Sequence, residues 1–399
     1  MKIVHIEDFF HPEAGYQINV LPKYMAELGH EVVIITSDMK NVDQGLTAFF
    51  GKENINNKDL VYFNKNRVRI IRIAMHGYIF NRAVLSHSLF KIIQTENPDI
   101  VYVHGNDTLT GMRMLLKCGN FKYPIIMDSH MLEMASNSKF SKLFHKMYKA
   151  IFTPIIVKNN IYVIRTQDDP YVEKCLGIPL DLSPWISVGS DTMLFKPDLS
   201  LRKKVRNELK ISEDAFLIIY AGKLDKAKGG VFLGKAIKEE FPTDKEIVFL
   251  IIGNCVGEYG KEVEGILSES KNRIIRLPSQ KYIDLEQYYA ASDLAIFPRQ
   301  CSLSFYDAQA SGLPVVSENN NINCDRCSHN NGDNFIAESI EDFRAKMMKF
   351  ASLHEDKWME YSKNARLYIE RDYDYSNIVN QYMYYLTKSI ELKKGREGI

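Results

Sequence analysis

Short apolar runs rich in β-branched residues alternate along the chain with longer amphipathic stretches. In the first half of the chain these runs predict buried strands at residues 2–6, 31–36, 68–73, 99–105, 124–130 and 161–166. Apolar residues three and four positions apart predict helices at residues 17–28 and 83–94. Strands that alternate with helices indicate βαβ units and a parallel sheet that is covered on both faces.

A second series of apolar runs follows Pro197 and predicts strands at residues 216–222, 247–253, 272–278, 293–298 and 314–318. Residues 177–197 contain the proline and glycine residues that are typical of a linker. We therefore expect an α/β protein with two doubly wound, Rossmann-like domains that face a cleft, where ligands of such folds bind. The expected domains are 1–190 and 191–375, and a C-terminal helix at 376–399 is expected to pack back on the first domain.

The composition excludes several classes of protein. The 399 residues include 51 Lys plus Arg and 50 Asp plus Glu, so the net charge near +1 offers no general attraction to nucleic acid. No apolar run reaches the roughly 18 residues that span a bilayer, and the N-terminus lacks the pattern of a signal peptide. The 6 cysteines are too sparse for a disulfide scaffold. We expect the protein to lie in the reducing cytoplasm.

Two segments near predicted strand ends carry residues suited to a nucleotide. In AGKLDKAKGG (221–230), Lys223 and Lys228 can offset the charge of a diphosphate, and the alternative is a solvated lysine loop. In 298–316, Ser302 or Ser304 can cap a short helix whose N–H groups suit a phosphate. Asp307 lies within that helix among apolar residues, which favours a partner such as a ribose diol over a surface position.

Two further features belong to the first domain. The loop at 11–17 and His130 both follow predicted strands, so they lie at carboxyl strand ends, although an isolated histidine is more often structural. Residues 139–151 place lysines between apolar residues, with no acidic residue between 139 and 158. Such a helix can lie on an anionic membrane, or it can bury its apolar stripe on the sheet, and both can hold.

The order of these segments resembles the retaining glycosyltransferases of GT-B fold, family 4. MKIVHIEDFFHPEAGYQ is similar to the opening strand and glycine-rich loop of that family, and VGSDTMLFKPD (188–198) is similar to its interdomain linker. GKLDKAKGG is similar to its phosphate loop, and YDAQASGLPVV to its donor-binding helix. GHEVVIITS and PDIVYVHG resemble its second and fourth strands, so the resemblance covers nearly the whole chain.

The resemblance implies roles for particular residues. It implies that Lys223 and Lys228 bind the donor diphosphate, that Asp307 holds the ribose hydroxyls, and that Gly15 lets the first loop approach the phosphate or the acceptor. It assigns His130 to the donor sugar, near the reacting carbon, as the catalytic residue. It implies neither a metal ion nor a further cofactor, because the nucleotide sugar is a co-substrate.

The chain departs from the family pattern at two positions. Lys223 stands where arginine is usual, which keeps the charge and loses the bidentate fork. Arg299 stands where the first acid of the family's E-x-x-x-x-x-x-x-E pattern is expected to grip the donor sugar. Arg299 therefore meets a negatively charged donor sugar or turns away to pair with an acid of the protein. The surroundings of the sugar are expected to include Cys301, Ser302, Leu303 and Ser304.

The expected function is transfer of a sugar, with retention, from a nucleoside diphosphate donor to a glycan or lipid-linked acceptor. A UDP-sugar is the expected donor, and surface polysaccharide or glycoconjugate synthesis is the expected context. Peripheral contact with an anionic membrane through 139–151 would place the protein at the inner face of the membrane. Two alternatives are a catalytically silent GT-B nucleotide-binding partner subunit and a nucleotide-sugar epimerase.

Overall fold

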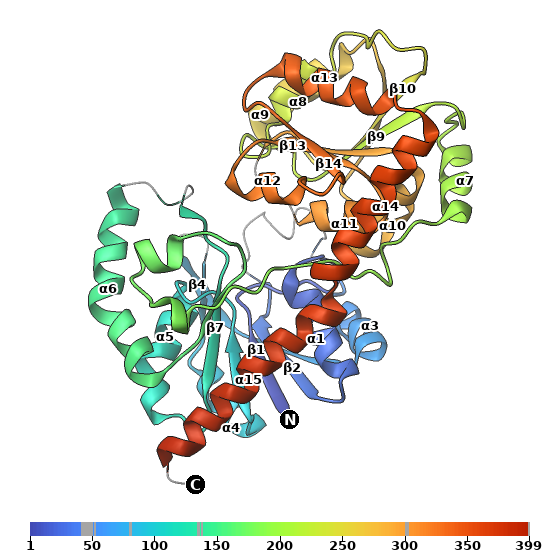
Figure 1. The fold of residues 1–399 in the computed structure, drawn as a ribbon. Coiled ribbons are helices and arrows are strands. Elements are labelled where there is room, and N and C mark those ends of the chain that lie inside the picture. Colours follow the sequence, from blue (N-terminus) through green and yellow to red (C-terminus); the bar gives the residue numbers. More distant parts are fainter. Residues whose placement is uncertain are drawn as a thin grey trace. The chain divides into compact units, whose positions relative to one another are not determined.

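The chain folds into two compact units. The computed structural model describes residues 1–40, 51, 53–79, 82–133, 136, 139–299 and 303–397. The first unit contains Met1–Val188 and Tyr375–Ile399, and the second contains Gly189–Asp374 (Figure 1). These boundaries lie close to those expected at residues 190 and 375.

The first unit is built on a parallel sheet in the strand order β3-β2-β1-β6-β7-β8. Its strands are β1 (Lys2–Ile6), β2 (Glu31–Ser37), β3 (Val68–Ile73), β6 (Ile100–Val103), β7 (Ile125–Ser129) and β8 (Val163–Arg165). Val4 of β1 lies opposite Val33 on one side and Val101 on the other, and all three are buried. The chain reverses direction across the sheet between β1 and β6, and ligands of doubly wound folds bind at the carboxyl ends of strands beside such a reversal.

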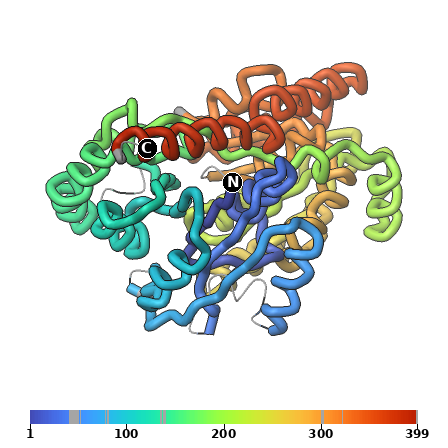
Figure 2. The backbone as a smooth tube through the Cα atoms, turned by 90° about the horizontal axis from the view of Figure 1, so that it is seen from below, coloured from blue at the N-terminus to red at the C-terminus, as the bar shows by residue number. Residues whose placement is uncertain are grey.

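Helices cover this sheet, and the last of them comes from the end of the chain. They are α1 (Gln17–Glu27), α3 (Ile55–Asn66), α4 (Ser88–Glu96), α5 (Leu109–Lys117), α6 (Lys139–Asn159) and α15 (Tyr375–Glu397), with short turns at Cys118–Asn120, Tyr171–Cys175 and Leu180–Leu182. Figure 2 shows α15, in red, running across the first unit. Gln17 of α1 donates to the Tyr382 hydroxyl at 2.6 Å, which fastens α15 to α1. Among the described helices, none is long and apolar enough to cross a bilayer.

The helix expected over residues 83–94 begins later than predicted. Residues Arg82–Leu85 form strand β5, which pairs antiparallel with β4 (Met75–Ile79), and α4 begins only at Ser88. The backbone N–H of Ala83 donates to Oδ2 of the buried Asp8 at 3.1 Å. The prediction was wrong at these residues because pairing with β4 and this contact outweigh the local helical pattern.

The second unit repeats the same sheet topology, in the order β11-β10-β9-β12-β13-β14. Its strands are β9 (Phe216–Ala221), β10 (Ile247–Ile252), β11 (Arg273–Leu277), β12 (Leu294–Phe297), β13 (Val315–Glu318) and β14 (Gly332–Phe335). Its helices are α7 (Leu199–Glu208), α8 (Gly230–Ala236), α9 (Gly257–Ser268), α10 (Leu285–Ala291), α11 (Ser304–Ala310), α12 (Asn321–Arg326), α13 (Ile340–Ala351) and α14 (Glu355–Asp372), with a short turn at Tyr282–Asp284. The reversal of strand order falls between β9 and β12.

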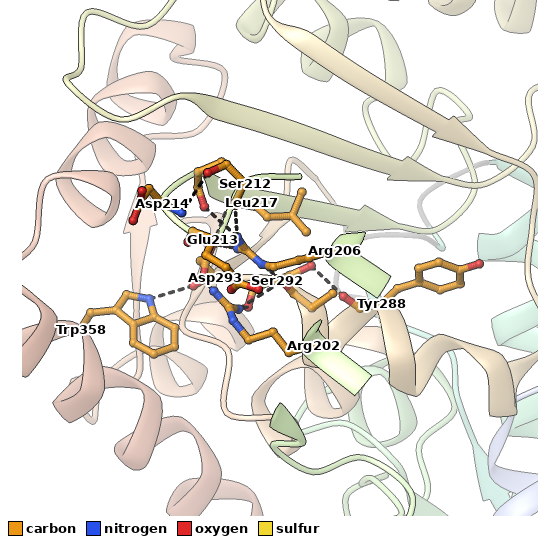
Figure 3. A network of polar contacts seen from close by, with 12 residues as sticks. Arg202, Arg206, Ser212, Glu213, Asp214, Leu217, Tyr288, Ser292, Asp293 and Trp358 are labelled. Atoms are coloured by element: carbon orange, nitrogen blue, oxygen red, sulfur yellow. Dashed lines mark hydrogen bonds and ion pairs between the residues drawn. The ribbon is translucent and has the colours of Figure 1, made fainter. Parts of the chain in front are cut away.

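A buried ion-pair network joins several elements at the amino ends of these strands (Figure 3). Oδ2 of Asp293 accepts from Arg206 at 2.6 Å and from the N–H of Leu217 at 2.7 Å, and Oδ1 accepts from Arg202 at 2.7 Å. The Asp293 carbonyl accepts from the indole of Trp358 at 2.9 Å. Because Arg206 is fully buried, its charge requires this pairing. The network ties α7, β9 and α14 to the start of β12.

Candidate functional site

The carboxyl edge of the second sheet holds the loop 222–229, which connects β9 to α8. The loop begins where two backbone segments touch: a Cβ atom on Gly253, at the end of β10, would lie 1.8 Å from the carbonyl oxygen of Gly222. Gly253 also has a φ of +148°, a conformation that suits glycine. Only glycine therefore fits at position 253 beside the start of the loop.

Backbone and side-chain contacts fix the shape of this loop. The Tyr220 hydroxyl donates to the carbonyl oxygen of Lys223 at 2.6 Å. Oδ1 of Asp225 accepts from the backbone N–H of Lys228 at 2.8 Å, an Asx-type turn that brings the chain around to α8. Lys223 is exposed and Lys228 is half-buried. The loop thus carries both ammonium groups at the edge where ligands of such sheets bind.

Arg299 follows β12 and lies against this loop. A Cβ atom on Gly229 would lie 3.0 Å from Cγ of Arg299, so the arginine stem packs on the loop where glycine leaves room. The Arg299 guanidinium donates to both carboxylate oxygens of Glu338. Arg299 is therefore engaged by an acid of the protein itself, the second of the two arrangements expected for it.

Asp307 is buried in α11 and is held by two hydroxyl groups. Its Oδ1 accepts from Ser190 at 2.6 Å and from Tyr282 at 3.2 Å. Burial raises the pKa of Asp307 to about 7, although both hydroxyl donors favour the charged form. The carboxyl group therefore changes charge near neutral pH.

The start of α11 differs from the expected capped helix. Leu303 occupies the N-cap position in a helical conformation, and no side chain caps the helix there. Ser304 is the first helical residue, so the expectation that Ser304 caps the helix was wrong. Cys301 and Ser302, which were expected near the donor sugar, lie outside the described residues.

In the first unit, His130 follows β7 at the carboxyl edge of the sheet. Its Nδ1 lies 3.0 Å from the Thr166 hydroxyl, which itself donates to the carbonyl oxygen of Ser129 at 3.0 Å. The hydroxyl proton is thus used, and Thr166 can only accept from Nδ1–H. Nε2 of His130 faces Oδ2 of Asp128 at 3.4 Å, and a carboxylate also only accepts. The two contacts therefore suit a ring that is protonated on both nitrogens, an imidazolium.

The electrostatics of Asp128 agree with this assignment. Partial burial of His130 works against its charged form, but the Asp128 carboxylate outweighs that effect and raises the pKa of His130. Burial alone would raise the pKa of Asp128 as well, yet His130 and His104 hold it well below its usual range. With 47% of its side chain exposed, the His130 ring is accessible to solvent or a ligand.

A chain of buried polar groups supports Asp128 from behind. Nδ1 of His104 lies 2.8 Å from Oδ2, the Tyr102 hydroxyl donates to the same oxygen at 3.0 Å, and the N–H of Gly105 donates to Oδ1 at 2.7 Å. Nε2 of His104 in turn meets Nδ1 of His5 at 3.0 Å. These contacts join β1, β6 and β7 and fix the position of the carboxylate that faces His130.

Sequence reasoning missed Asp128, His104 and Glu7, which surround the predicted His130. Burial raises the pKa of Glu7 to about 7, against the influence of His104. A signal was present, because HIE, VHG and DSH each end an apolar strand with titratable residues. Gly15 lies farther along the loop after β1, directly before Tyr16, the N-cap of α1.

One group among the described residues brings three possible metal ligands together: atoms of His104, Asp128 and His130 lie within 4.8 Å of one another. Asp128 already accepts hydrogen bonds from Tyr102 and from the N–H of Gly105. The His104 and His130 nitrogens that face Asp128 act as donors in this arrangement. The contacts of Asp128 are therefore those of a hydrogen-bonded network.

A cavity of about 960 Å³ lies in the second unit, at the opposite edge of the sheet. It is lined by residues that include Phe216, Leu313 and Trp358, beside the Asp293 network. Of the described residues predicted for the site, none lines it. The cavity is thus separate from the loop that carries Lys223 and Lys228.

Comparison with known proteins identifies the fold and the domain. Residues 202–368 match the family described as Glycosyl transferases group 1. A glycosyltransferase from Rickettsia africae ESF-5 has a similar structure, with a TM-score of 0.73 at 16% identity over 99% of this chain and 98% of that one. This chain has the GT-B fold. The GT-B fold also appears in Anabaena Alr3699/HepE, solved in complex with UDP and glucose, with a TM-score of 0.73 at 16% identity over 97% of this chain and 100% of that one.

Curated relatives of this GT-B protein are more similar in sequence than these structures but overlap with less of the chain. The lipopolysaccharide 1,2-N-acetylglucosaminetransferase of Salmonella typhimurium is 27% identical over 28% of this chain, and the chain spans only about a third, 32%, of that relative. The UDP-Gal:alpha-D-GlcNAc-diphosphoundecaprenol alpha-1,3-galactosyltransferase of Escherichia coli is 24% identical over 70% of this chain and 72% of the relative.

Proposed function

We propose that this GT-B protein is a retaining hexosyltransferase that moves a sugar from a UDP-sugar to a glycan or lipid-linked acceptor. Anabaena Alr3699/HepE, with the same fold, has been solved with UDP and with UDP-glucose. The names of the two curated relatives describe sugar transfer in lipopolysaccharide and to a diphosphoundecaprenol-linked sugar. These similarities support a role in surface polysaccharide or glycoconjugate synthesis.

The observation that carries the proposal is the loop 222–229 at the carboxyl edge of the second sheet, within the residues that match the family. Lys223 and Lys228 supply two positive charges from one ordered loop, and these offset the charge of the donor diphosphate. As the diphosphate leaves, it gains negative charge, so the same two ammonium groups stabilise it more in the transition state than in the bound donor.

Asp307 is assigned to the ribose of the donor. A carboxylate accepts hydrogen bonds from both hydroxyls of a ribose, and it must be ionised to accept two. Its Oδ1 already accepts hydrogen bonds from Ser190 and Tyr282. Donor binding would therefore remove the proton held at acidic pH and add the ribose hydroxyls to those contacts.

His130 is assigned to the reacting sugar. An imidazolium donates strong hydrogen bonds and carries a full positive charge, and both properties favour the departure of an anionic leaving group. Asp128 keeps the ring protonated and oriented without touching the substrate. We expect the chemistry to need no metal ion.

The donor sugar is assigned as a neutral hexose. The charge of Arg299 is already balanced by Glu338, so no uncompensated cation remains there for a uronic acid. Leu303 and Ser304 would lie beside the sugar instead. Activity with a UDP-uronic acid in preference to the neutral UDP-hexose would contradict this part of the proposal.

Two other functions predict different behaviour. A silent partner subunit would bind UDP and turn nothing over, and the substitution of the usual acid by Arg299 is the feature that favours it. An epimerase would convert the nucleotide sugar with no acceptor present. A transferase requires an acceptor for turnover.

The test begins with melting temperatures measured with UDP, GDP, ADP and their sugars. A ligand held at 100 times its Kd adds about 2.7 kcal/mol of stability. Release of UDP is then measured with and without glycan and lipid-linked acceptors, and NMR establishes the anomeric configuration of the product. Acceptor-dependent release with retention is the expected result, while acceptor-independent conversion or inversion would contradict the proposal.

A further inference from the structure

Helix α6 has two apolar faces, and only one of them is used by the fold. His145, Tyr148, Phe152 and Ile156 point inward and are buried in the first unit. A second apolar column faces solvent. Its members and their exposed fractions are Phe140 (85%), Leu143 (68%), Met147 (37%) and Ile151 (47%).

The exposed column is continuous along the helix. Its residues are three, four and four positions apart, a spacing that places them one above the other on one side of an α-helix. Figure 1 shows α6 at the outer side of the first unit, beside α5. A surface helix normally buries its single apolar stripe against the core. The inward face already does so here, and the outer column therefore requires another explanation.

Lysines run beside the exposed column. Lys142 and Lys146 are both exposed, and no acidic residue occurs between positions 139 and 158. Within the described part of the chain, neither lysine forms an ion pair with an acid. Lys149 differs, because its ammonium group donates to the carbonyl oxygen of Lys174 at 2.7 Å. The charges of Lys142 and Lys146 are thus turned outward next to the apolar column.

We propose that the outer face of α6 is a membrane-binding surface that lies flat on an anionic lipid bilayer. Phe140, Leu143 and Met147 would enter the boundary between headgroups and acyl chains, and the two lysines would meet lipid phosphates. The proposal rests on α6 alone and stands independently of the transferase assignment.

The charges of Lys142 and Lys146 favour a bilayer over a second copy of this chain as the partner of the exposed face of α6. Two copies packed through the exposed column would bring Lys142 and Lys146 of one copy near the same lysines of the other. With no acidic residue on the helix to offset them, these like charges would repel. Anionic headgroups instead complement the lysines along the whole column. The bilayer is therefore the occupant that fits both features of the surface.

The test measures sedimentation of the full chain with vesicles of phosphatidylcholine, with or without phosphatidylglycerol. We expect binding only to the anionic vesicles, and weaker binding as salt is raised. The variant Lys142→Gln/Lys146→Gln should bind about 30-fold more weakly, since each lysine near such a surface contributes about fivefold. The variant Phe140→Ser/Leu143→Ser should lose about tenfold or more.

Matched control variants separate this surface from general effects. Lys203→Gln/Lys204→Gln removes two exposed lysines from α7, and Leu60→Ser/Val61→Ser removes two exposed apolar residues from α3. Both controls should bind vesicles like the wild type, and all variants should keep the wild-type melting temperature to within a few degrees.

Several results would overturn the proposal. They are absence of binding to anionic vesicles by the wild type, equal losses in the α6 and control variants, and binding that salt does not change. A further contradicting result could come from analytical ultracentrifugation. If the wild type self-associates and Phe140→Ser/Leu143→Ser is monomeric without any change in vesicle binding, the surface joins two copies of the chain. Loss of UDP binding or of turnover would bear only on the transferase assignment.

Discussion

Nε2 of His130 lies 3.4 Å from Oδ2 of Asp128, at the carboxyl edge of the first sheet. Asp128 is fully buried and is fixed by Tyr102, His104 and the N–H of Gly105, so the distance is set by the sheet and not by two flexible side chains. The Asp128 carboxylate favours the protonated, positively charged form of the half-exposed His130 ring. Because Asp128 is fixed in place, its effect on the protonation of His130 can be measured.

Removing the carboxylate charge should lower the pKa of His130. Asp128→Asn keeps the size of the side chain and loses the negative charge that raises the pKa of His130, so we expect this pKa to fall. The measurement is NMR titration of the ring protons. Asp168→Asn, an exposed acid in the same unit, is the control and should leave the titration unchanged.

The side chain of His130 and its charge should also affect the rate of sugar transfer. His130→Ala should lower kcat about a hundredfold or more, while UDP affinity changes only a few-fold. The raised pKa of His130 extends the cationic form of the ring to higher pH, and the charge is lost as pH rises through that pKa, so activity should decline on the alkaline side. In Asp128→Asn the decline should begin at lower pH. Full activity in His130→Ala would make His130 a structural residue.

The lysines of the loop 222–229 can be compared with one another for their effect on UDP binding. Lys228→Ala should weaken UDP binding by about 1.5 to 3 kcal/mol, the scale of a charge-assisted hydrogen bond. Lys226→Ala removes an exposed lysine of the same loop and should change affinity little. Calorimetry measures both. Equal affinities in Lys228→Ala, Lys223→Ala and the wild type would remove the loop from the diphosphate site.

Asp307 makes donor binding depend on pH. Its pKa of about 7 means that the carboxyl holds a proton below neutrality, and this proton must leave before ribose hydroxyls can both donate to it. UDP-glucose affinity should therefore rise between pH 6 and pH 8 and level off above, and this rise should be absent in Asp307→Asn. UDP-glucose is the ligand of choice because a terminal phosphate itself titrates near pH 6. A flat profile in the wild type would contradict the assignment.

The network at the amino edge of the second sheet predicts a large effect on stability. Asp293→Ala leaves the buried Arg206 without its carboxylate, which should cost about 3 to 5 kcal/mol of unfolding free energy. Asp214→Ala, an exposed acid nearby, should cost less than about 0.5 kcal/mol. Urea denaturation followed by circular dichroism compares the two variants.

The apolar pattern of the sequence predicts most of the sheet but not every strand. Runs such as 216–222 and 247–253 are almost entirely apolar because parallel strands are buried on both faces, and they became β9 and β10. β14 was missed because Gly332–Phe335 contains a single large apolar residue, Phe335. Its strand conformation comes from pairing with β13, a long-range contact that no local pattern shows.

Some residues of the candidate site could also be predicted from the sequence, and others could not. Residues such as Lys228 and His130 could be found from their positions after predicted strands. Their neighbours could not, because the contact of Asp128 with His104 depends on how β6 and β7 align side by side, and the pairing of Arg299 with Glu338 joins residues 39 positions apart. Strand register and loop packing are tertiary properties, and they decide the charge state of each group.

The Asp293 network and the loop 222–229 lie at opposite edges of one sheet. Substitutions in the loop would leave untouched the ion pairs that hold α7 and α14 in place at the far edge. The residues proposed to bind the donor can therefore change without loss of the ion pairs that stabilise this unit. For an engineer, the same separation recommends exchanging residues 222–229 as a cassette and leaving Arg202, Arg206 and Asp293 as they are.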